Sequence, residues 1–96
     1  MIASFGDRAT EDLFNGIESA RARRFPKEIV AGALRKLDML NAATALLDLR
    51  SPPGNMLETL QGDLKGFHSV RVNKQWRVVF RWVGGDAQEV RLVDYH

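Results

Sequence analysis

The sequence predicts an α+β fold in which N-terminal helices pack on one face of a small antiparallel sheet. The first half of the 96 residues spaces its apolar residues as an amphipathic helix does, and after Gly66 the spacing changes to alternation. Short turn sequences separate the alternating stretches, which is typical of consecutive strands in an antiparallel sheet. We expect one domain over residues 1–96, because a chain of this length can build a single modest core.

The N-terminal region is expected to hold a short strand and a short helix. Residues 2–5 are apolar enough for an edge strand. Residues 7–14 follow as a helix, with Asp7 as its cap and Leu13 and Phe14 as its buried pair. An Asn-Gly pair then ends this helix, because both residues accept left-handed backbone conformations.

A basic cluster at residues 21–24 precedes the main helix. We interpret it as a solvated helix turn rather than a phosphate site, because no partner pattern lies beside it. The main helix begins at Pro26, which suits a first turn, and runs to about Leu40. Its apolar stripe consists of Ile29, Ala33, Leu37 and Leu40, widened by Val30 and Leu34. A further helical piece at residues 42–49 either continues this helix or breaks from it, and two prolines after Ser51 stop it.

Three strands are expected in the second half, over residues 68–72, 76–83 and 87–94. Asn73 and Lys74 form the first turn, and the second lies at the Gly-Gly-Asp sequence that follows Val83. A two-residue loop there would place Arg81 opposite Gln88. A three-residue loop instead matches apolar with apolar residues and pairs opposite charges, so we prefer it. The preferred pairs are Phe80–Val90, Val78–Leu92, Arg81–Glu89, Arg77–Val93 and Trp76–Asp94.

This register gives the sheet two different faces. The face expected to bury the helices carries Trp76, Val78, Phe80, Trp82, Val90 and Leu92. The other face carries Arg77 and Arg81 and, if the first hairpin keeps its parity, Arg71, with Tyr95 on the same side. Surface ion pairs with Glu89 would account for the arginines on this face without any functional role. Together with the end of the chain, however, they favour a functional surface.

The last three residues, Asp94, Tyr95 and His96, supply a carboxylate, a phenol and an imidazole. Cleaving RNA without a metal requires a base for the 2′-hydroxyl, an acid for the leaving oxygen and cations for the growing charge. His96 suits either proton role, because the ordinary pKa of histidine lies near neutral pH. Asp94 could orient that imidazole, and Tyr95 could donate a proton or stack on a base.

Basic residues are the candidates for holding the phosphates. Ten arginines and four lysines give a net charge of only +2, and internal ion pairs explain such residues as well as phosphate contacts do. We expect Arg77, with Arg71 or Arg81, to hold the scissile phosphate, and Lys65 and Lys74 to bind further RNA phosphates.

The composition excludes other classes of protein. No apolar run approaches the roughly 18 residues of a membrane span, and the N-terminus lacks the layout of a signal peptide. Cysteine is absent, and His68 falls on the core side of its strand, so a metal site is improbable. We expect a cytoplasmic protein that needs no metal and no cofactor.

Residues 66–80 and the terminal Asp-Tyr-His resemble the HigB toxins of the RelE/ParE superfamily, and residues 1–5, 42–44 and 49–55 are similar to them too. The resemblance implies a RelE-like microbial ribonuclease fold and cleavage of mRNA on the ribosome without a metal. It implies a hetero-oligomer with a helix-turn-helix, HigA-like antitoxin. Asp94, Tyr95 and His96 would be active-site residues and Arg77 the phosphate-binding arginine.

One departure from the family pattern concerns Glu58 and Gln61, where some members have histidine and lysine. Histidine and lysine can carry a positive charge at these positions, whereas a carboxylate and an amide cannot. This predicts weaker catalysis or greater reliance on His96 and Arg71. Two alternatives stay open: a ParE-like gyrase poison, which needs no acid–base group at its C-terminus, and a non-catalytic module that only binds an antitoxin.

Overall fold

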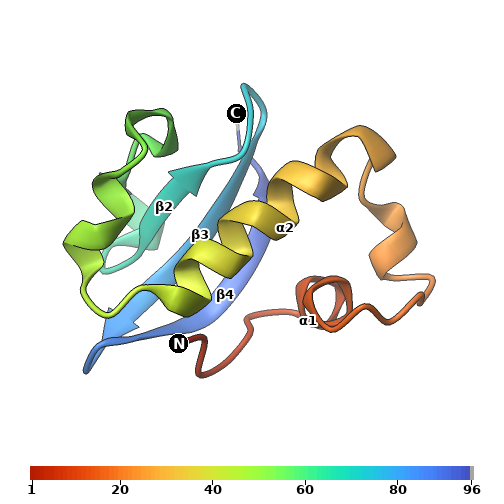
Figure 1. Cartoon of the computed structure of the whole chain (residues 1–96), viewed down its shortest axis with the longest axis horizontal. Coiled ribbons are helices and arrows are strands. Elements are labelled where there is room, and N and C mark those ends of the chain that lie inside the picture. Colours follow the sequence, from red (N-terminus) through yellow and green to blue (C-terminus); the bar gives the residue numbers. More distant parts are fainter. Residues whose placement is uncertain (96) are drawn as a thin grey trace.

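The computed structural model describes residues 1–95 as two α-helices and a four-stranded sheet (Figure 1). The helices and strands are α1 (Arg8–Phe14), α2 (Lys27–Ala42), β1 (Glu58–Thr59), β2 (His68–Arg71), β3 (Trp76–Val83) and β4 (Asp86–Asp94). Short 3₁₀ turns lie between them, namely η1 (Ala22–Arg24), η2 (Leu46–Arg50), η3 (Pro53–Asn55) and η4 (Gly62–Leu64). The strands are in the order β1-β2-β3-β4 and every neighbouring pair is antiparallel. The expected α+β class is confirmed.

The two helices follow the sequence signals closely. Asp7 caps α1 by accepting a hydrogen bond of 2.7 Å from the Thr10 amide, and Gly16 follows with a φ of 73°. In α2, the buried residues are the four of the expected stripe. The stretch after α2 breaks from it, since α2 ends at Ala42 and the next turn, η2, is a separate 3₁₀ element.

Residues 2–5 add a partial fifth strand beside β4. Ile2 bridges Ala87 and Phe5 bridges Val90, both in parallel orientation. Backbone hydrogen bonds link Ala3 to Ala87 at 2.7 Å and Gly6 to Val90 at 2.9 Å. The segment therefore covers the free edge of β4, as expected for an edge strand.

The register between β3 and β4 combines the two alternatives that the sequence allowed. The preferred three-residue loop is wrong: Gly84 and Gly85 form a two-residue turn, both with positive φ, and Arg81 pairs with Gln88. The register then shifts by one residue between Val79 and Arg81. From there to the end of β4 the preferred pairs hold: Val78 with Leu92, Arg77 with Val93, and Trp76 with Asp94.

A β-bulge on β4 explains the shift. Glu89 has a φ of 53°, a left-handed conformation that non-glycine residues seldom adopt. The extra residue changes the parity of the strand, so that Ala87 and Val90 both face the core although they are three residues apart. Ala87 and Val90 are both fully buried, which indicates that their packing outweighs the local strain at Glu89.

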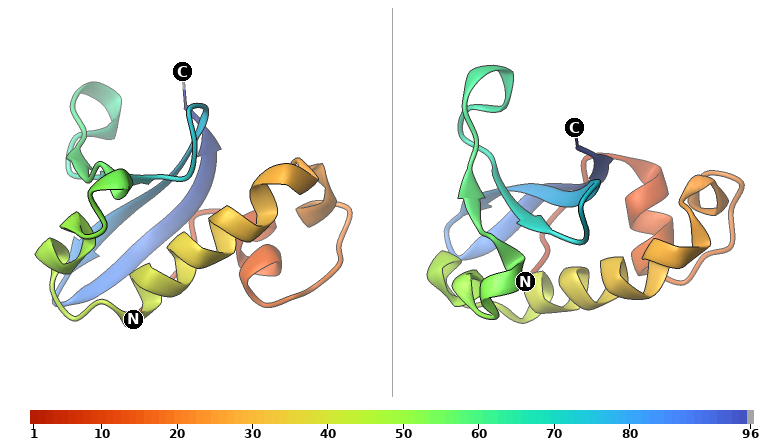
Figure 2. Two further views of the ribbon diagram at one scale, coloured as in Figure 1. Left: turned by 45° about the horizontal axis from the view of Figure 1, so that its top comes forward. Right: turned by 90° about the horizontal axis from the view of Figure 1, so that it is seen from above.

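The core lies between the helices and one face of the sheet. α2 crosses that face, and the loop that contains η4 rises from the other face (Figure 2). The helix-side cluster includes Leu37 and Leu40 of α2 with Val78, Phe80 and Leu92 of the sheet. Within residues 1–95, no helix has both the length and the hydrophobicity that crossing a membrane requires.

A second apolar cluster on the opposite face was not expected from the sequence. Leu60, Phe67 and Val79 form its buried centre, and Leu64, Val93 and Tyr95 pack around them. The loop between β1 and β2 supplies three of these residues and so covers part of the face that carries the arginines. This face is therefore partly packed, rather than a fully exposed sheet surface.

Candidate functional site

The candidate site lies on the sheet face that points away from the helices. Arg71 of β2 is directly opposite Arg77 of β3, so the first hairpin keeps its parity and both side chains share this face. Arg81 follows on β3, with a half-exposed side chain. The three arginines that the sequence grouped thus share one face of the sheet, with Arg71 and Arg77 adjacent and Arg81 further along β3.

Arg77 is buried, which differs from the expected exposed position on the sheet. Only 8% of the residue is accessible to solvent. Its Nε donates a 2.8 Å hydrogen bond to the Ser69 hydroxyl, and Nη2 donates to the Met56 carbonyl. Its Nη1 lies 3.6 Å from the Glu58 carboxylate. The planar guanidinium therefore has a protein partner at each nitrogen, and its orientation is set before any substrate binds.

The loop segment that meets Arg77 is itself in an unusual conformation. Met56 has a φ of 44°, in the left-handed region. Besides the bond from Arg77 to its carbonyl, its sulfur lies 3.2 Å from Nη1 of Arg71. Arg71 also donates from Nε to the Asn73 carbonyl at 3.0 Å. Both arginines thus contact Met56, which lies two residues before β1. Arg71 is more exposed to solvent than Arg77.

The other end of this face carries two stacked cations. The guanidinium carbon of Arg81 lies 4.4 Å from the ring centre of Phe67, and that of Arg91 lies 5.7 Å from the same ring. Arg81 also forms an ion pair of 2.8 Å with Glu89, the residue in the bulge. Gly66 allows this arrangement, because a Cβ there would lie 3.3 Å from Arg81 Nη1.

Arg91 was missed by the sequence reasoning although it shares the face. It pairs with Val79, next to the pair of Val93 with Arg77. The signal was available in the expected register, since Arg91 lies two residues before Val93 and therefore has the same parity. Within the described chain, Arg91 takes part in no ion pair.

The end of the chain is fixed beside the arginines up to residue 95. The Tyr95 amide donates a 2.6 Å hydrogen bond to the Gln75 carbonyl, and Gln75 Nε2 donates at 2.9 Å to the Asp94 carboxylate. The Tyr95 ring centre lies 5.8 Å from the Arg77 guanidinium carbon. His96, the third residue of the expected catalytic group, lies outside the described residues.

The two lysine candidates lie apart from each other. Lys74 is exposed in the turn between β2 and β3, at the end of the sheet where Trp76 pairs with Asp94. Lys65 is exposed after η4, next to Gly66 and so near Arg81. They therefore flank the arginine face at opposite ends instead of joining one cluster.

Glu58 and Gln61 lie on the rim of the same face. Glu58 belongs to β1 and is the acidic partner of Arg77, whereas Gln61 is exposed just before η4. A carboxylate at position 58 offsets part of the positive charge of the buried arginine.

The remaining histidine is not part of this face. The His68 ring packs against Phe80 on the helix side, with ring centres 5.9 Å apart, and its Nδ1 lies 3.1 Å from the Thr59 hydroxyl. Burial lowers the pKa of His68, because the charged imidazolium is poorly solvated there. No group of three or more histidine, cysteine, aspartate or glutamate side chains in residues 1–95 is arranged to hold a metal ion.

Comparisons with known proteins identify relatives of this chain. The family described as the RelE-like toxin of type II toxin-antitoxin system HigB matches residues 3–96. Toxin HigB-1 of Vibrio cholerae is 46% identical over 92 residues, which cover 96% of this chain and 95% of that protein. Endoribonuclease HigB of Proteus vulgaris is 31% identical over 97 residues, covering both chains completely.

Solved structures show the same fold in more distant proteins. The YoeB-YefM complex from Staphylococcus aureus superposes with a TM-score of 0.61 at 14% identity, covering 100% of this chain and 98% of that one. The match supports the arrangement of two N-terminal helices packed on a four-stranded antiparallel sheet. With a family match over residues 3–96 and two relatives above 30% identity, the chain belongs to the HigB family of RelE-like toxins of type II toxin–antitoxin systems.

Proposed function

We propose that the chain is an endoribonuclease toxin that cleaves mRNA on the ribosome without a metal ion and so stops translation and growth. The activity is suggested by the name of the Proteus vulgaris relative. The observation that carries the proposal is the end of β4, where the Tyr95 ring lies 5.8 Å from the guanidinium carbon of the buried Arg77, directly after Asp94 in the chain. Acid–base groups and a fixed cation at one spot are what phosphodiester cleavage requires.

In this proposal the residues of the arginine face and of the chain end have different catalytic roles. Arg77 stabilises the charge that grows on the phosphorus oxygens, and its fixed position avoids a reorganisation cost during the reaction. Arg71, more accessible, holds a neighbouring phosphate oxygen. Asp94, Tyr95 and His96 provide the base for the 2′-hydroxyl and the acid for the leaving 5′-oxygen. The cations at the site take the charge-neutralising part that a metal ion plays in other nucleases.

The remaining basic residues guide the RNA strand. Arg81, Lys65 and Lys74 contact phosphates away from the cleaved bond. The low net charge of +2 gives little affinity for free RNA, so the ribosome supplies the positioning. The toxin would act in the cytoplasm as one domain of residues 1–96, neutralised by a helix-turn-helix, HigA-like antitoxin in a hetero-oligomer.

Primer extension on a defined mRNA tests the proposal. In a reconstituted translation reaction, adding the protein should produce new 5′ ends at a fixed position within codons. The same mRNA without ribosomes should stay uncut at equal protein concentration. An uncut mRNA together with DNA breaks in expressing cells would instead identify a gyrase poison. If neither nucleic acid is cut and growth continues, the chain only binds an antitoxin.

We expect Glu58→Gln to raise the rate of mRNA cleavage several-fold. The substitution removes the negative charge beside Arg77 but keeps the length of the side chain at position 58. The positive charge of Arg77 is then no longer offset, so it attracts the phosphate more strongly. A gain of about five-fold corresponds to roughly 1 kcal/mol, the upper end of what a partly exposed charge pair contributes. Single-turnover cleavage on programmed ribosomes measures the rate.

Glu28→Gln is the matched control for this substitution. Glu28 lies exposed in the first turn of α2, on the side of the molecule away from the site. Its cleavage rate should equal that of the unchanged protein. A rate for Glu58→Gln at or below that of Glu28→Gln would contradict the idea that Glu58 restrains Arg77.

A further inference from the structure

Arg91 is an arginine of the sheet face to which the proposed chemistry gives no role. It is half-buried on β4, directly opposite Val79 of β3. Val79 lies two residues after Arg77, so Arg91 and Arg77 are diagonal neighbours on one face of the sheet. Such neighbours have Cα atoms about 7–8 Å apart, a spacing comparable to that of consecutive phosphates in an RNA strand. Arg91 is therefore placed about one phosphate away from the cation of the candidate site.

The side chain of Arg91 is held in place along its length. Its aliphatic stem lies against the backbone of Gly6, where an added Cβ would come within 2.5 Å of Cγ and 2.7 Å of Cδ. Gly6 is itself fixed, because its amide donates a 2.9 Å hydrogen bond to the Val90 carbonyl. At the other end, the guanidinium carbon lies 5.7 Å from the centre of the Phe67 ring. Because the side chain is already oriented, it loses little conformational entropy when a ligand binds.

The guanidinium of Arg91 keeps its N–H donors available for a ligand. Across residues 1–95 it forms no ion pair and donates no hydrogen bond. Two carboxylates on this side of the sheet are paired with other arginines: Glu58 with Arg77, and Glu89 with Arg81 at 2.8 Å. An oriented guanidinium with free donors and no carboxylate partner is suited to binding a phosphate.

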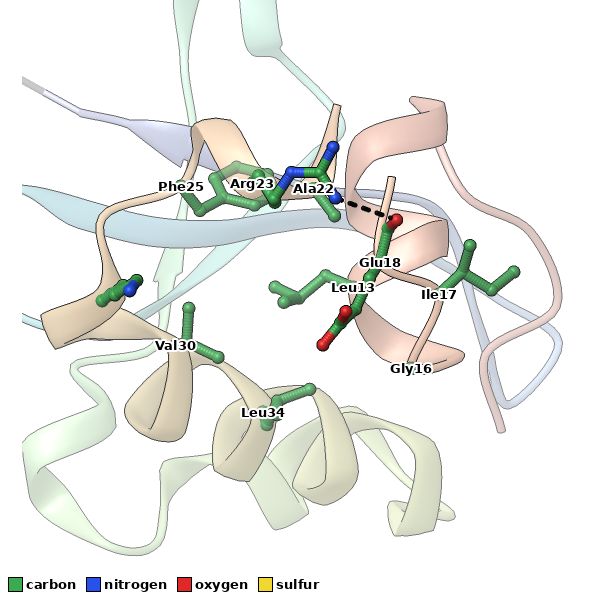
Figure 3. Close-up of a pocket in the computed structure, with 10 residues that line it drawn as sticks. Leu13, Gly16, Ile17, Glu18, Ala22, Arg23, Phe25, Val30 and Leu34 are labelled. Carbon is green, nitrogen blue, oxygen red and sulfur yellow. Dashed lines mark hydrogen bonds between the residues drawn. The ribbon is translucent and has the colours of Figure 1, made fainter. Parts of the chain in front are cut away.

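The cations on the helix side of the molecule have different surroundings. Arg23 lines an apolar hollow between α1 and the first turns of α2 (Figure 3). It donates a 3.2 Å hydrogen bond to the Glu18 carbonyl, and the side chain of Glu18 lines the same hollow. A carboxylate in the lining opposes the binding of a phosphate. Free guanidinium donors without an acidic neighbour thus distinguish Arg91 from Arg23.

We propose that Arg91 binds the mRNA phosphate next to the scissile one, with its guanidinium supported by the Phe67 ring. The inference rests on the proposed function, in which Arg77 holds the scissile phosphate. Contacts to two consecutive phosphates fix the position of the strand on the sheet without reading its sequence. They hold the scissile linkage in place beside the chain end, which is what the acid–base groups require.

Binding of the full-length chain to ribosomes programmed with a non-cleavable mRNA tests the inference. A 2′-deoxynucleotide before the scissile linkage, whose position primer extension defines, removes the attacking hydroxyl, so affinity is measured without cleavage. In two further versions of this mRNA, an uncharged methylphosphonate replaces the phosphate on one side or the other of the scissile linkage. The unchanged protein should bind one of these versions about 10-fold more weakly, because a hydrogen bond to a charged group is lost.

Arg91→Gln should bind the fully charged mRNA about 10-fold more weakly, and the sensitive methylphosphonate should then cause almost no further loss. Arg91→Lys keeps a positive charge and should stay sensitive to the same linkage. Arg35→Gln is the matched control, since Arg35 is exposed on α2, on the other side of the sheet. It should remain as sensitive to the methylphosphonate as the unchanged protein. Circular dichroism verifies that each variant is folded.

The outcomes separate this inference from the proposed function. Unchanged affinity in Arg91→Gln would overturn the phosphate contact and assign the side chain to packing on Phe67. Weaker binding with undiminished sensitivity to both methylphosphonates would overturn it too, and would indicate a contact with ribosomal RNA. Loss of that sensitivity in Arg91→Gln, when the unchanged protein never cleaves the unmodified mRNA, would support the contact while rejecting the nuclease function. A chain that does not bind programmed ribosomes would overturn both.

Discussion

Replacing His96 with alanine is expected to lower the rate of mRNA cleavage by about 10²–10⁴-fold, the usual contribution of a general acid or base. The expectation rests on the chemistry of the sequence, because His96 lies outside the described residues. It is supported by the fixed position of its neighbours: the Tyr95 amide is bonded to Gln75 at 2.6 Å, and Tyr95 packs against Arg77.

The other histidine provides the matched control. His68 lies on the helix side of the sheet, where burial lowers its pKa and keeps it neutral near pH 7. His68→Gln retains a hydrogen-bonding side chain for Thr59 and should cleave mRNA at the rate of the unchanged protein. Cleavage that survives His96→Ala but is lost in His68→Gln would reverse the assignment.

Tyr95→Phe removes the hydroxyl group and keeps the aromatic ring, so it tests the two separately. The ring belongs to the second apolar cluster and should keep its place without the hydroxyl. If the phenol transfers a proton, cleavage falls while the folded signal in circular dichroism is unchanged. Deleting Asp94 to His96 should remove cleavage entirely, and growth arrest that persists in the deleted form would reject the catalytic role of the chain end.

Much of the fold follows from the sequence because local patterns and burial agree. The stripe from Ile29 to Leu40 is the buried face of α2, and alternation located β2, β3 and β4. The bulge at Glu89 could not be anticipated, since left-handed positions normally carry glycine or asparagine. Its cause is tertiary: Ala87 and Val90 must both reach the core, and only an extra residue allows this.

The grouping of Arg71, Arg77 and Arg81 on one face was predictable from the sequence, but the burial of Arg77 was not. Register placed Arg71, Arg77 and Arg81 on one face and brought Asp94 next to Trp76. What the sequence did not show is the loop from β1 to β2, whose Leu60 and Phe67 pack on that face. No periodic pattern marks a two-residue strand such as β1, so the partner that buries Arg77 was missed.

Arg77→Ala is consequently expected to destabilise the fold as well as to abolish cleavage. Truncation leaves the Ser69 hydroxyl and the Met56 carbonyl without their donor inside the protein. The Ser69 hydroxyl is fully buried, so the loss of its donor, together with the lost packing of the arginine side chain, is expected to cost about 2–4 kcal/mol in total. In a domain of this size that lowers the melting temperature by roughly 10–25 °C, which thermal unfolding followed by circular dichroism can measure.

Arg71→Ala is the control that separates stability from catalysis. It removes the same side chain from the paired position on β2, where the contacts are a carbonyl of the adjacent turn and the Met56 sulfur. Its stability loss should stay below about 1 kcal/mol, because the side chain is only partly buried. Cleavage should nevertheless fall, since a phosphate contact is lost.

The assay for Arg77→Ala must use folded protein. Cleavage is therefore measured well below the melting temperature of the variant, with circular dichroism of the same sample confirming the native signal. Under these conditions the rate should remain at least about 10²-fold below that of the unchanged protein, as for the removal of a charge-stabilising donor. A folded variant that cleaves normally would show that Arg77 serves the structure alone. Arg77→Lys should recover little of either property, because a single ammonium cannot reach Ser69, Met56 and Glu58 at once.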